Sequence, residues 1–398
     1  MRLTVASSFP IHPPRGGGQE RIAGLYRAMG ALGAVVEIVT LAERRERRRR
    51  IALGPGVTEV RVPMSPAFER ADLQLKLGAG IPATDLALVR HHDLAPEFGE
   101  ALRESARDAD AVVASHPFAL DALQAATDRP LVYEAHNVEA DLKEQMLAGS
   151  PAAAELTALA EDVERRAVAA ARVVFVCSEQ DRARLQERYG LDPARTAMVP
   201  NGADPATVPY TAPQVRAALR RRLGLAGRHA MFVGSWHEPN LVAVRAILDA
   251  APALEDVRWL VLGSVGQAFA DVEDRPQVDL AGPVDQRFLE AVLRIADVAV
   301  NPMRTGSGTN LKMLTYALAG VPIVSSPTGA RGLGFEAGRH HLEAAPDDLG
   351  SGVRAVLQLD PDRRRQLVEA ARDHVLERFS WPGIARRTLD DVLRPAFG

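Results

Sequence analysis

The sequence predicts an α/β protein with two doubly wound, parallel-sheet domains. Three observations lead to this prediction. The chain has 398 residues, which is long for a single domain. Short continuous apolar runs alternate with helical patterns from end to end, as is typical of parallel strands covered by helices on both faces. A stretch with three prolines and no helical period, residues 200–209, separates two such halves.

Each half contains its own series of strands and helices. The expected strands are residues 3–6, 34–39, 111–114, 131–133 and 173–176 in the first half, and 231–233, 259–262, 298–300 and 321–324 in the second. The expected helices include residues 19–32, 152–170, 180–189, 241–254, 285–295 and 311–318. An amphipathic segment over 363–379 and 381–393, broken at Pro382-Gly383, ends the chain. We expect one domain over residues 1–204 and another over 205–380.

Composition excludes several classes of function. The formal net charge of −3 argues against nucleic-acid binding. Cys177 is the single cysteine, so no disulfide framework or cysteine metal site is expected, and its apolar surroundings predict a buried thiol. The pair Asp108 and Asp110 matches a metal-binding Asp-x-Asp, but it precedes a strand instead of following one, so we interpret the match as accidental. We expect neither a metal nor a bound cofactor.

The sequence also carries indications of location. The N-terminus enters a strand pattern at once, which predicts no signal peptide, and the longest uncharged stretch contains Pro322 and Pro327, which predicts no membrane span. We therefore expect a cytoplasmic protein. The run from Arg44 to Arg50 holds six arginines and one glutamate. It is either a solvated loop or a peripheral contact with an anionic membrane surface or a phosphorylated acceptor.

The strongest candidate site is the segment Gly306-Ser307-Gly308-Thr309-Asn310, which precedes the expected helix 311–318. A loop of small residues between a strand and a helix directs backbone N–H groups and the positive end of the helix dipole toward one point. Such a point favours a phosphate. Lys312 adds a positive charge within the first turn of the helix.

Four further segments follow the carboxyl ends of expected strands, where ligands bind in open α/β sheets. Gly17 and Gly18 lie in a glycine-rich connection that is either a tight turn or a place of close backbone approach to a ligand. His136 follows the strand 131–133 and is either a site residue or a surface histidine with a structural hydrogen bond. His116 follows the strand 111–114 and either faces the same site or has a structural role. Ser235 follows the strand 231–233.

Taken together, these motifs resemble the retaining GT-B glycosyltransferases of family 4 (glycosyl transferases group 1). The resemblance is carried by the order of Gly17-Gly18-Gln19-Glu20, Val199-Pro-Asn-Gly-Ala-Asp204 and Gly320-Val-Pro-Ile-Val324 over nearly the whole chain. It implies two Rossmann-like domains that face each other across a cleft, with residues 381–398 crossing back to the first domain. It also implies an acceptor-binding N-terminal domain and a C-terminal domain that binds a nucleotide-diphosphate sugar.

The resemblance assigns roles to particular residues. His136 matches the active-site histidine that contacts the transferred sugar, and Lys312 matches the basic residue that neutralises the leaving diphosphate. Gly17 and Gly18 match the loop that approaches that diphosphate. The other donor-binding candidates are Ser235, Gly306, Ser307, Gly308, Thr309, Asn310 and Thr315. No metal is implied.

The chain departs from the family pattern at three positions. Ser307 and Thr315 stand where a Glu-x7-Glu motif places glutamates, and Ser235 stands where an arginine is common. Thr315 is too short to hold both ribose hydroxyls as a glutamate does. The resemblance as a whole still implies a retaining, metal-independent hexosyl-type transferase that acts in polysaccharide, envelope glycolipid or natural-product glycosylation. The alternative is a non-catalytic GT-B protein that binds a sugar nucleotide or a partner chain.

Overall fold

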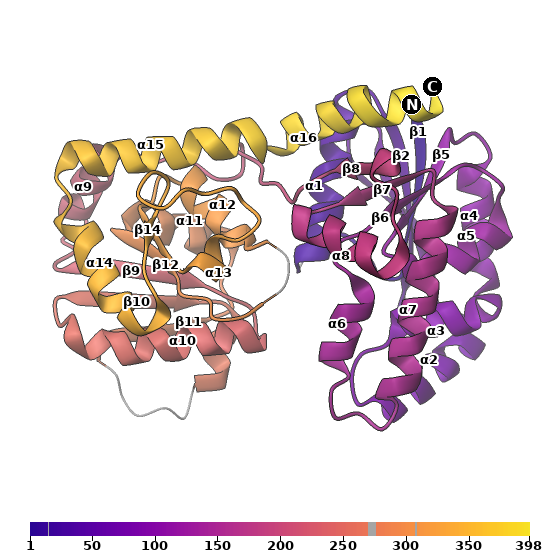
Figure 1. The fold of residues 1–398 in the computed structure, drawn as a ribbon, viewed down its shortest axis with the longest axis horizontal. Helices are drawn as coiled ribbons and strands as arrows, with labels where there is room; N and C mark the ends of the chain where they lie inside the picture. The colour runs from indigo at the N-terminus through magenta and orange to yellow at the C-terminus, as the bar shows by residue number, and fades with distance from the viewer. Residues whose placement is uncertain (15, 270–275, 307–308) are drawn as a thin grey trace. The chain divides into compact units, whose positions relative to one another are not determined.

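The computed structural model describes residues 1–14, 16–269, 276–306 and 309–398. The chain folds into two compact units. The N-terminal unit comprises Met1–Gly202 and Trp381–Gly398, and the C-terminal unit comprises Ala203–Ser380. Each unit has a central sheet with helices on both faces (Figure 1). This confirms the predicted α/β fold with two doubly wound, Rossmann-like domains.

The N-terminal unit is built on an eight-stranded sheet in the order β3-β4-β2-β1-β5-β6-β7-β8 within the described residues. Neighbouring strands are parallel except for β3, which pairs antiparallel with β4 at one edge. The strands are β1 (Arg2–Ser7), β2 (Val35–Ala42), β3 (Arg49–Gly54), β4 (Val57–Pro63), β5 (Ala111–Ser115), β6 (Leu131–Glu134), β7 (Val173–Val176) and β8 (Thr196–Met198).

Alternate residues of these strands enter two hydrophobic cores, one on each face. Val132 of β6 packs in one core, while Leu131 and Tyr133 pack in the other. This two-sided burial explains the continuous apolar runs in the sequence. The helices are α1 (Gly17–Ala31), α2 (Pro66–Ala79), α3 (Thr84–His91), α4 (Pro96–Ala106), α5 (Leu120–Ala126), α6 (Glu139–Met146), α7 (Ala153–Ala170) and α8 (Glu179–Tyr189).

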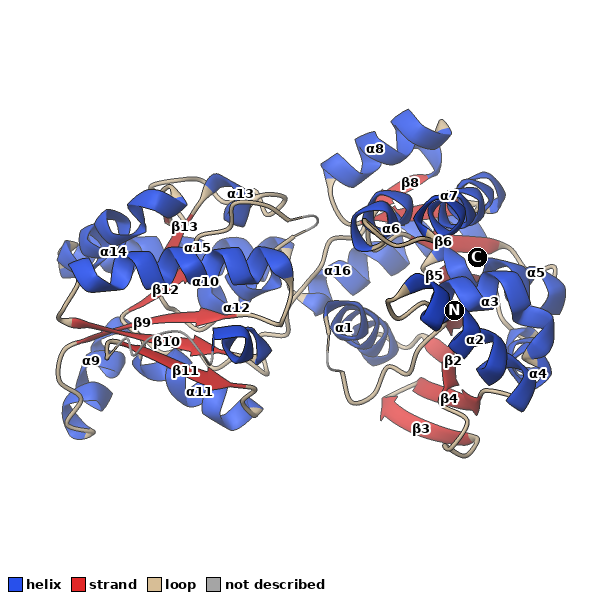
Figure 2. Ribbon diagram, turned by 90° about the horizontal axis from the view of Figure 1, so that it is seen from below, coloured by secondary structure: helices blue, strands red, loops and turns tan. Residues whose placement is uncertain are grey.

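The C-terminal unit has a parallel sheet in the order β11-β10-β9-β12-β13-β14 among the residues that the structure describes (Figure 2). Its strands are β9 (Arg228–Val233), β10 (Val257–Leu262), β11 (Val278–Gly282), β12 (Val298–Asn301), β13 (Ile323–Ser325) and β14 (Leu342–Glu343). Its helices are α9 (Pro213–Arg222), α10 (Glu238–Ala250), α11 (Gln286–Ile295), α12 (Leu311–Leu318), α13 (Pro327–Ala330), α14 (Leu349–Gln358) and α15 (Pro361–Arg378). Here too the strands contribute to two cores, with Phe232 in one and Met231 in the other.

The last residues of the chain belong to the N-terminal unit. They form α16 (Trp381–Arg387), a π-helical turn (Thr388–Leu393) and α17 (Arg394–Phe397). Trp381, Ile384 and Leu389 pack in the same core as α1, and a Cβ atom on Gly24 of α1 would lie 2.2 Å from Trp381 Nε1. The expected break at Pro382-Gly383 was placed wrongly. The chain leaves α15 at Phe379–Ser380, and Pro382 lies within the first turn of α16, where a proline costs no helical hydrogen bond.

Candidate functional site

In the N-terminal unit, the two candidate histidines meet. His116 follows β5 and His136 follows β6, and these strands are parallel neighbours. The two imidazole rings have centroids 3.9 Å apart and are tilted by 39°. The sheet topology thus brings together two side chains that are 20 positions apart in the sequence.

His136 is held in a buried, neutral state. Its side chain is 5% exposed, its Nε2 shares a hydrogen bond of 3.0 Å with Ser115 Oγ, and Glu134 Oε1 lies 3.7 Å from the same nitrogen. Burial, and next the neighbouring His116, lower the pKa of His136 to about 4. At neutral pH the ring is therefore a neutral hydrogen-bonding group, with Nε2 committed to Ser115 or Glu134 and Nδ1 turned elsewhere.

His116 occupies an unusual backbone conformation. Its φ is +68° and its ψ is +156°, a region populated almost entirely by glycine and costing about 1–3 kcal/mol for other residues. Its Nδ1 is buried and has no hydrogen-bond partner among the described residues. Burial lowers the pKa of His116 to about 4. Strain and an unpaired polar atom at one residue are typical of a site built for a ligand.

The glycine-rich connection lies against this histidine pair. Gly17 and Gly18 form the first turn of α1, whose backbone N–H groups have no acceptor within the helix. A Cβ atom on Gly18 would lie 3.6 Å from both His136 Nδ1 and His116 Cε1. Any side chain longer than a methyl group would therefore fill the space beside His136. Glycine keeps this space open.

A buried ion pair between Arg21 and Glu134 lies next to His136. Glu134 is fully buried and accepts hydrogen bonds from Arg21 Nε at 3.0 Å and Tyr26 Oη at 2.9 Å. Burial alone would raise the pKa of Glu134, but the Arg21 guanidinium, then His136 and the Tyr26 hydroxyl hold it well below its usual range. Glu134 was not among the residues predicted from the sequence. The signal that could have identified it is a charged residue at the end of a buried strand.

A second buried carboxylate fixes the segment that follows His136. Glu164 accepts the backbone N–H groups of Glu139 at 2.8 Å and Ala140 at 3.1 Å, at the start of α6. It also accepts the hydroxyls of Tyr133 and Tyr189, each at 2.9 Å. This carboxylate ties α6 to α7 and β6. Glu164 was not predicted from the sequence either, because it lies within an ordinary amphipathic helical pattern.

In the C-terminal unit, Lys312 is the candidate cation for binding phosphate. Its Nζ donates to Asn240 Oδ1 at 2.7 Å and lies 4.3 Å from the centroid of the Phe232 ring. No carboxylate lies within ion-pair distance of it in the described part of the chain. Burial lowers the pKa of Lys312 to about 7. An incoming anion would restore the full charge of this ammonium group.

Asn240 links Lys312 to the loop after β9. While its Oδ1 accepts from Lys312, its Nδ2 donates to the carbonyl oxygen of the exposed Ser235 at 3.0 Å. Thr315 lies three residues beyond Lys312 on α12 and is half-buried. Its hydroxyl makes no hydrogen bond within the described residues. The structure therefore places Ser235, Lys312 and Thr315 on connected elements of one unit.

The loop before α12 is described in part. Ser307 and Gly308 lie outside the described residues. Gly306 has a φ of +134°, and its carbonyl oxygen accepts a hydrogen bond from Arg331. Thr309 is half-buried. Asn310, directly before α12, donates from Nδ2 to the carbonyl oxygen of Gly329 at 3.1 Å. Gly306 and Asn310, at the two ends of the candidate phosphate loop, thus contact α13 and the residue after it.

Four other expectations concern features outside the candidate site residues. Cys177 is buried, and burial raises its pKa to about 12. Asp110 accepts the backbone N–H of Arg2 at 2.7 Å, which is a structural role. Within the described ranges, no group of three or more His, Cys, Asp and Glu side chains is arranged to hold a metal. None of the described helices is both long and apolar enough to span a bilayer.

The arginine run is largely neutralised by glutamates. The ion pairs are Arg44 with Glu69, Arg45 with Glu43, Arg48 with Glu104, Arg49 with Glu46, and Arg50 with Glu37. Arg49 and Arg50 belong to the edge strand β3 and not to a loop. This pairing favours the interpretation of a solvated, charge-balanced edge over that of a contact with anionic lipid.

Both units match known protein families. Residues 16–202 match the model of the glycosyl transferase 4-like domain, and residues 227–360 match that of the glycosyl transferases group 1. The chain is 26% identical over 403 residues to a D-inositol 3-phosphate glycosyltransferase of Geodermatophilus obscurus, covering 95% of this chain and 84% of that protein. It is 27% identical over 277 residues to a glycogen synthase of Mycobacterium tuberculosis, covering 66% and 62%.

Solved structures share the fold. Sucrose-phosphate synthase from Thermosynechococcus elongatus superposes with a TM-score of 0.75 at 18% identity, covering 100% of this chain and 99% of that one. Anabaena HepE in complex with UDP and glucose gives a TM-score of 0.68 at 15% identity, covering 98% of each chain. The two family matches lie one in each unit and together span most of the sequence, so the chain belongs to the GT-B glycosyltransferases of family 4, the glycosyl transferases group 1.

Proposed function

We propose that this protein is a retaining, metal-independent glycosyltransferase that moves a hexose from a nucleotide-diphosphate sugar to an acceptor. The C-terminal unit supplies the donor contacts and the N-terminal unit supplies His136 and the acceptor contacts. The observation that carries the proposal is Lys312, a half-buried ammonium group without a carboxylate partner in the described residues, next to a small-residue loop at a helix start. Such a group is suited to a diphosphate.

The chemistry proposed for Lys312 is electrostatic. Cleavage of the bond between the sugar and the diphosphate leaves negative charge on the departing phosphate oxygen. Lys312 and the backbone N–H groups at the start of α12 would stabilise this charge where it develops. Removing one such contact costs about 3–4 kcal/mol of barrier, a rate factor of about 100–1,000.

The role proposed for His136 is positional. Because the ring is neutral at physiological pH, it does not repel the positive charge that builds on the sugar ring in the transition state. Its Nδ1 edge lies beside Gly18, so a sugar hydroxyl or carbonyl could hydrogen-bond there. Gly17 and Gly18 are assigned to the close approach of the donor.

The first experiment identifies the nucleotide of the donor by measuring binding. Several solved relatives in fold hold UDP or a UDP-sugar, among them HepE and the E. coli trehalose-6-phosphate enzyme, so UDP-glucose stands first in a calorimetric panel of nucleotide diphosphates and their sugars. We expect base-selective binding that weakens at least tenfold in Lys312→Ala. Lys76→Ala, which removes one of the other two lysines of the chain, is the matched control.

Measurements of turnover distinguish the role of His136 from that of Lys312. His136→Ala should retain donor affinity within about threefold and lose about 100-fold in transfer or donor hydrolysis. Absence of binding across the whole panel, or equal binding by Lys312→Ala, would overturn the assignment of the donor site. The non-catalytic alternative is not favoured, since the relatives are named for glycosyl transfer or polysaccharide synthesis. Donor binding without transfer to any of a broad range of acceptors would revive it.

A further inference from the structure

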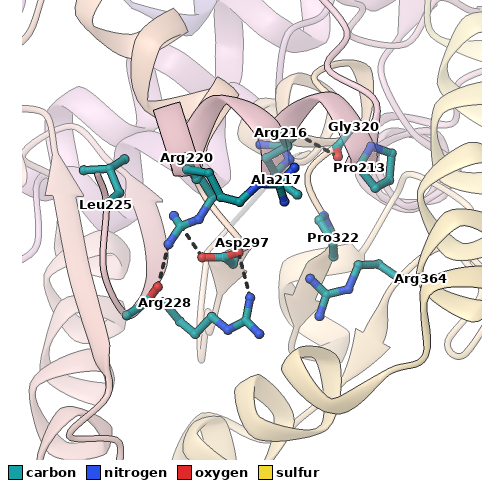
Figure 3. A pocket seen from close by; sticks show the side chains of 12 residues that line it. Pro213, Arg216, Ala217, Arg220, Leu225, Arg228, Asp297, Gly320, Pro322 and Arg364 are labelled. Carbon is teal, nitrogen blue, oxygen red and sulfur yellow. Dashed lines mark hydrogen bonds and ion pairs between the residues drawn. The ribbon is translucent and has the colours of Figure 1, made fainter. Parts of the chain in front are cut away.

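A cavity of about 280 Å³ lies in the C-terminal unit, and Figure 3 shows residues that line it. Its lining includes Arg228 at the start of β9, Asp297 directly before β12 and Pro322 directly before β13. These strands are parallel neighbours. The cavity therefore opens at the amino-terminal edge of the sheet, whereas Ser235 and residues 302–306 follow the carboxyl-terminal edge.

The charge around this cavity is strongly unbalanced. Five arginines line it, with a single carboxylate among them; we call this the arginine pocket and define it by Arg216, Arg220, Arg221, Arg228, Arg364 and Asp297. Asp297 is already shared, because its Oδ2 lies 3.0 Å from Arg220 Nη1 and its Oδ1 lies 3.5 Å from Arg228 Nη1. Among the described residues, Arg216, Arg221 and Arg364 have no carboxylate within ion-pair distance.

Arg216 is the most deeply buried arginine of the pocket. It is 5% exposed, and among the described residues its Nη atoms donate only to backbone carbonyls, including Ala296 at 2.9 Å and Gly320 at 2.9 Å. Its Nε is buried and unpaired among the described residues. Burial lowers the pKa of Arg216 to about 10, so the guanidinium still carries its charge at pH 7. A buried cation without a counter-ion is costly unless an anion accompanies it.

A purely structural role explains Arg216 but not the pocket. Arg216 donates to carbonyls at the ends of α11 and α12, where a cation stabilises the helix dipole. That role gives no reason for Arg221, Arg228 and Arg364 to line the same cavity. Arg364 is half-buried, donates only to the carbonyls of Val356 and Leu357 within the described residues, and has its pKa lowered by burial.

We propose that the arginine pocket binds a phosphate group, either free or esterified to a small molecule. Guanidinium groups match the tetrahedral oxygens of phosphate with paired N–H donors. A dianion would offset two of the four net positive charges. A volume of about 280 Å³ leaves room for a phosphate and a small organic group, but it is at the lower limit for a whole nucleotide. This site is separate from the donor site and has no part in the proposed transfer.

The test uses the full chain and inorganic phosphate in calorimetric titrations at constant ionic strength, set with sodium chloride. We expect saturable binding at one site, weakened at least tenfold in the double variant Arg221→Ala/Arg228→Ala. Both residues are exposed, so the fold should survive. The control Arg245→Ala/Arg287→Ala removes two exposed arginines elsewhere in the same unit and should bind phosphate within twofold of the parent.

Lys312→Ala separates the two candidate sites. Phosphate binding should persist in this variant, since the arginine pocket is intact. A phosphate monoester, glycerol 2-phosphate, then distinguishes the source of the group: tighter binding than inorganic phosphate indicates an esterified ligand, and weaker binding indicates free phosphate. The proposal is overturned if the parent protein shows no saturable binding, if binding is lost in Lys312→Ala, or if both double variants lose it equally.

Discussion

The rings of His116 and His136 lie in direct contact, with centroids 3.9 Å apart, and each has its pKa lowered to about 4. Both rings are therefore neutral in the folded protein at pH 7, whereas an unfolded chain titrates histidines near pH 6.5. Adding a proton to either ring would place a charge in a buried site beside the other ring. The difference in histidine pKa between the folded and the unfolded protein makes the free energy of unfolding depend on pH.

Acidification should destabilise the protein through these two histidines. Between pH 6.5 and 4 the unfolded chain binds more protons than the folded one, so stability falls as pH falls, by up to about 3 kcal/mol for each ring. We expect His136→Asn to reduce the slope of unfolding free energy against pH in this window, and the exposed His237→Asn to leave it unchanged. Denaturant titrations at half-unit pH steps measure the slope.

Glu164 changes the free energy of unfolding in the opposite direction over an overlapping pH range. Burial raises its pKa to about 7, so its contribution is present below pH 4.5 and is lost as pH rises toward 7. Both the parent and His136→Asn contain Glu164, so its contribution cancels when the slopes of unfolding free energy against pH are subtracted. A slope that is identical in the two proteins would contradict the assignment of neutral, buried histidines.

Donor binding should draw a proton onto Lys312. With a pKa of about 7 in the free protein, this amine is mostly neutral at pH 8, and an adjacent diphosphate raises its pKa. Binding at pH 8 should take up close to one proton, seen as an enthalpy that differs between buffers of different ionisation enthalpy. Lys312→Arg, which keeps the charge at all pH values, should show no uptake. Equal uptake by both proteins would exclude Lys312 as the source.

The hydroxyl of Thr315 should contribute to donor affinity. Thr315 stands where the family carries a ribose-binding glutamate, and its hydroxyl makes no hydrogen bond in the described part of the chain. If it accepts one ribose hydroxyl, the isosteric Thr315→Val should weaken binding of the nucleotide diphosphate by about 1 kcal/mol, roughly fivefold. Calorimetry on the two proteins measures this. An unchanged affinity would show that the ribose is held by other residues.

Replacing Glu164 should loosen the segment after His136. Glutamine has a single acceptor oxygen, so Glu164→Gln leaves buried N–H or O–H donors of Glu139, Ala140 or the two tyrosines without a partner. We expect a loss of about 2–4 kcal/mol in unfolding free energy. Tyr189→Phe removes one of the four hydrogen bonds and should cost about 1 kcal/mol. A glutamine variant no less stable than Tyr189→Phe would show that the backbone bonds to Glu164 contribute little.

The contact between Gly24 and Trp381 should give a measurable coupling. Gly24→Ala places a methyl group 2.2 Å from the indole, and overpacking of this kind costs about 1–3 kcal/mol. Trp381→Ala alone should cost about 3–5 kcal/mol. In the double variant the methyl group fits, so the total cost should be smaller than the sum. Gly99→Ala, at a helical glycine with open space around it, should instead stabilise by up to about 1 kcal/mol.

The central strands could be predicted because they are buried on both faces. Residues 173–176 were expected as a strand and form β7, and residues 111–114 and 131–133 lie within β5 and β6. The edge strand β3 and its neighbour β4 were missed. β3 begins Arg49-Arg50 and is largely exposed, while the inward side chains of β4 include the charged Glu59. Apolar runs reveal a strand only when packing, and not hydrogen bonding alone, holds it in place.

The candidate site was partly predictable for a related reason. Its histidines and glycines follow the carboxyl ends of strands, and the topology of parallel sheets makes such positions converge. The supporting carboxylates Glu134 and Glu164 could not be identified in this way, because each is defined by a partner far away in the chain. Arg21 is 113 positions from Glu134, and no local pattern carries that information.

The return of the C-terminal segment has a consequence for biosynthesis. Trp381, Ile384, Leu389 and Leu393 belong to the same core as α1 and β1, so residues 1–202 cannot complete that core when they leave the ribosome. At about 5–20 residues per second, the remaining chain takes on the order of 10–40 seconds to synthesise. During this delay the groove beside α1 stays open and apolar. The first unit to be made is thus the last to be finished, and a prematurely terminated chain exposes the surface that chaperones and proteases recognise.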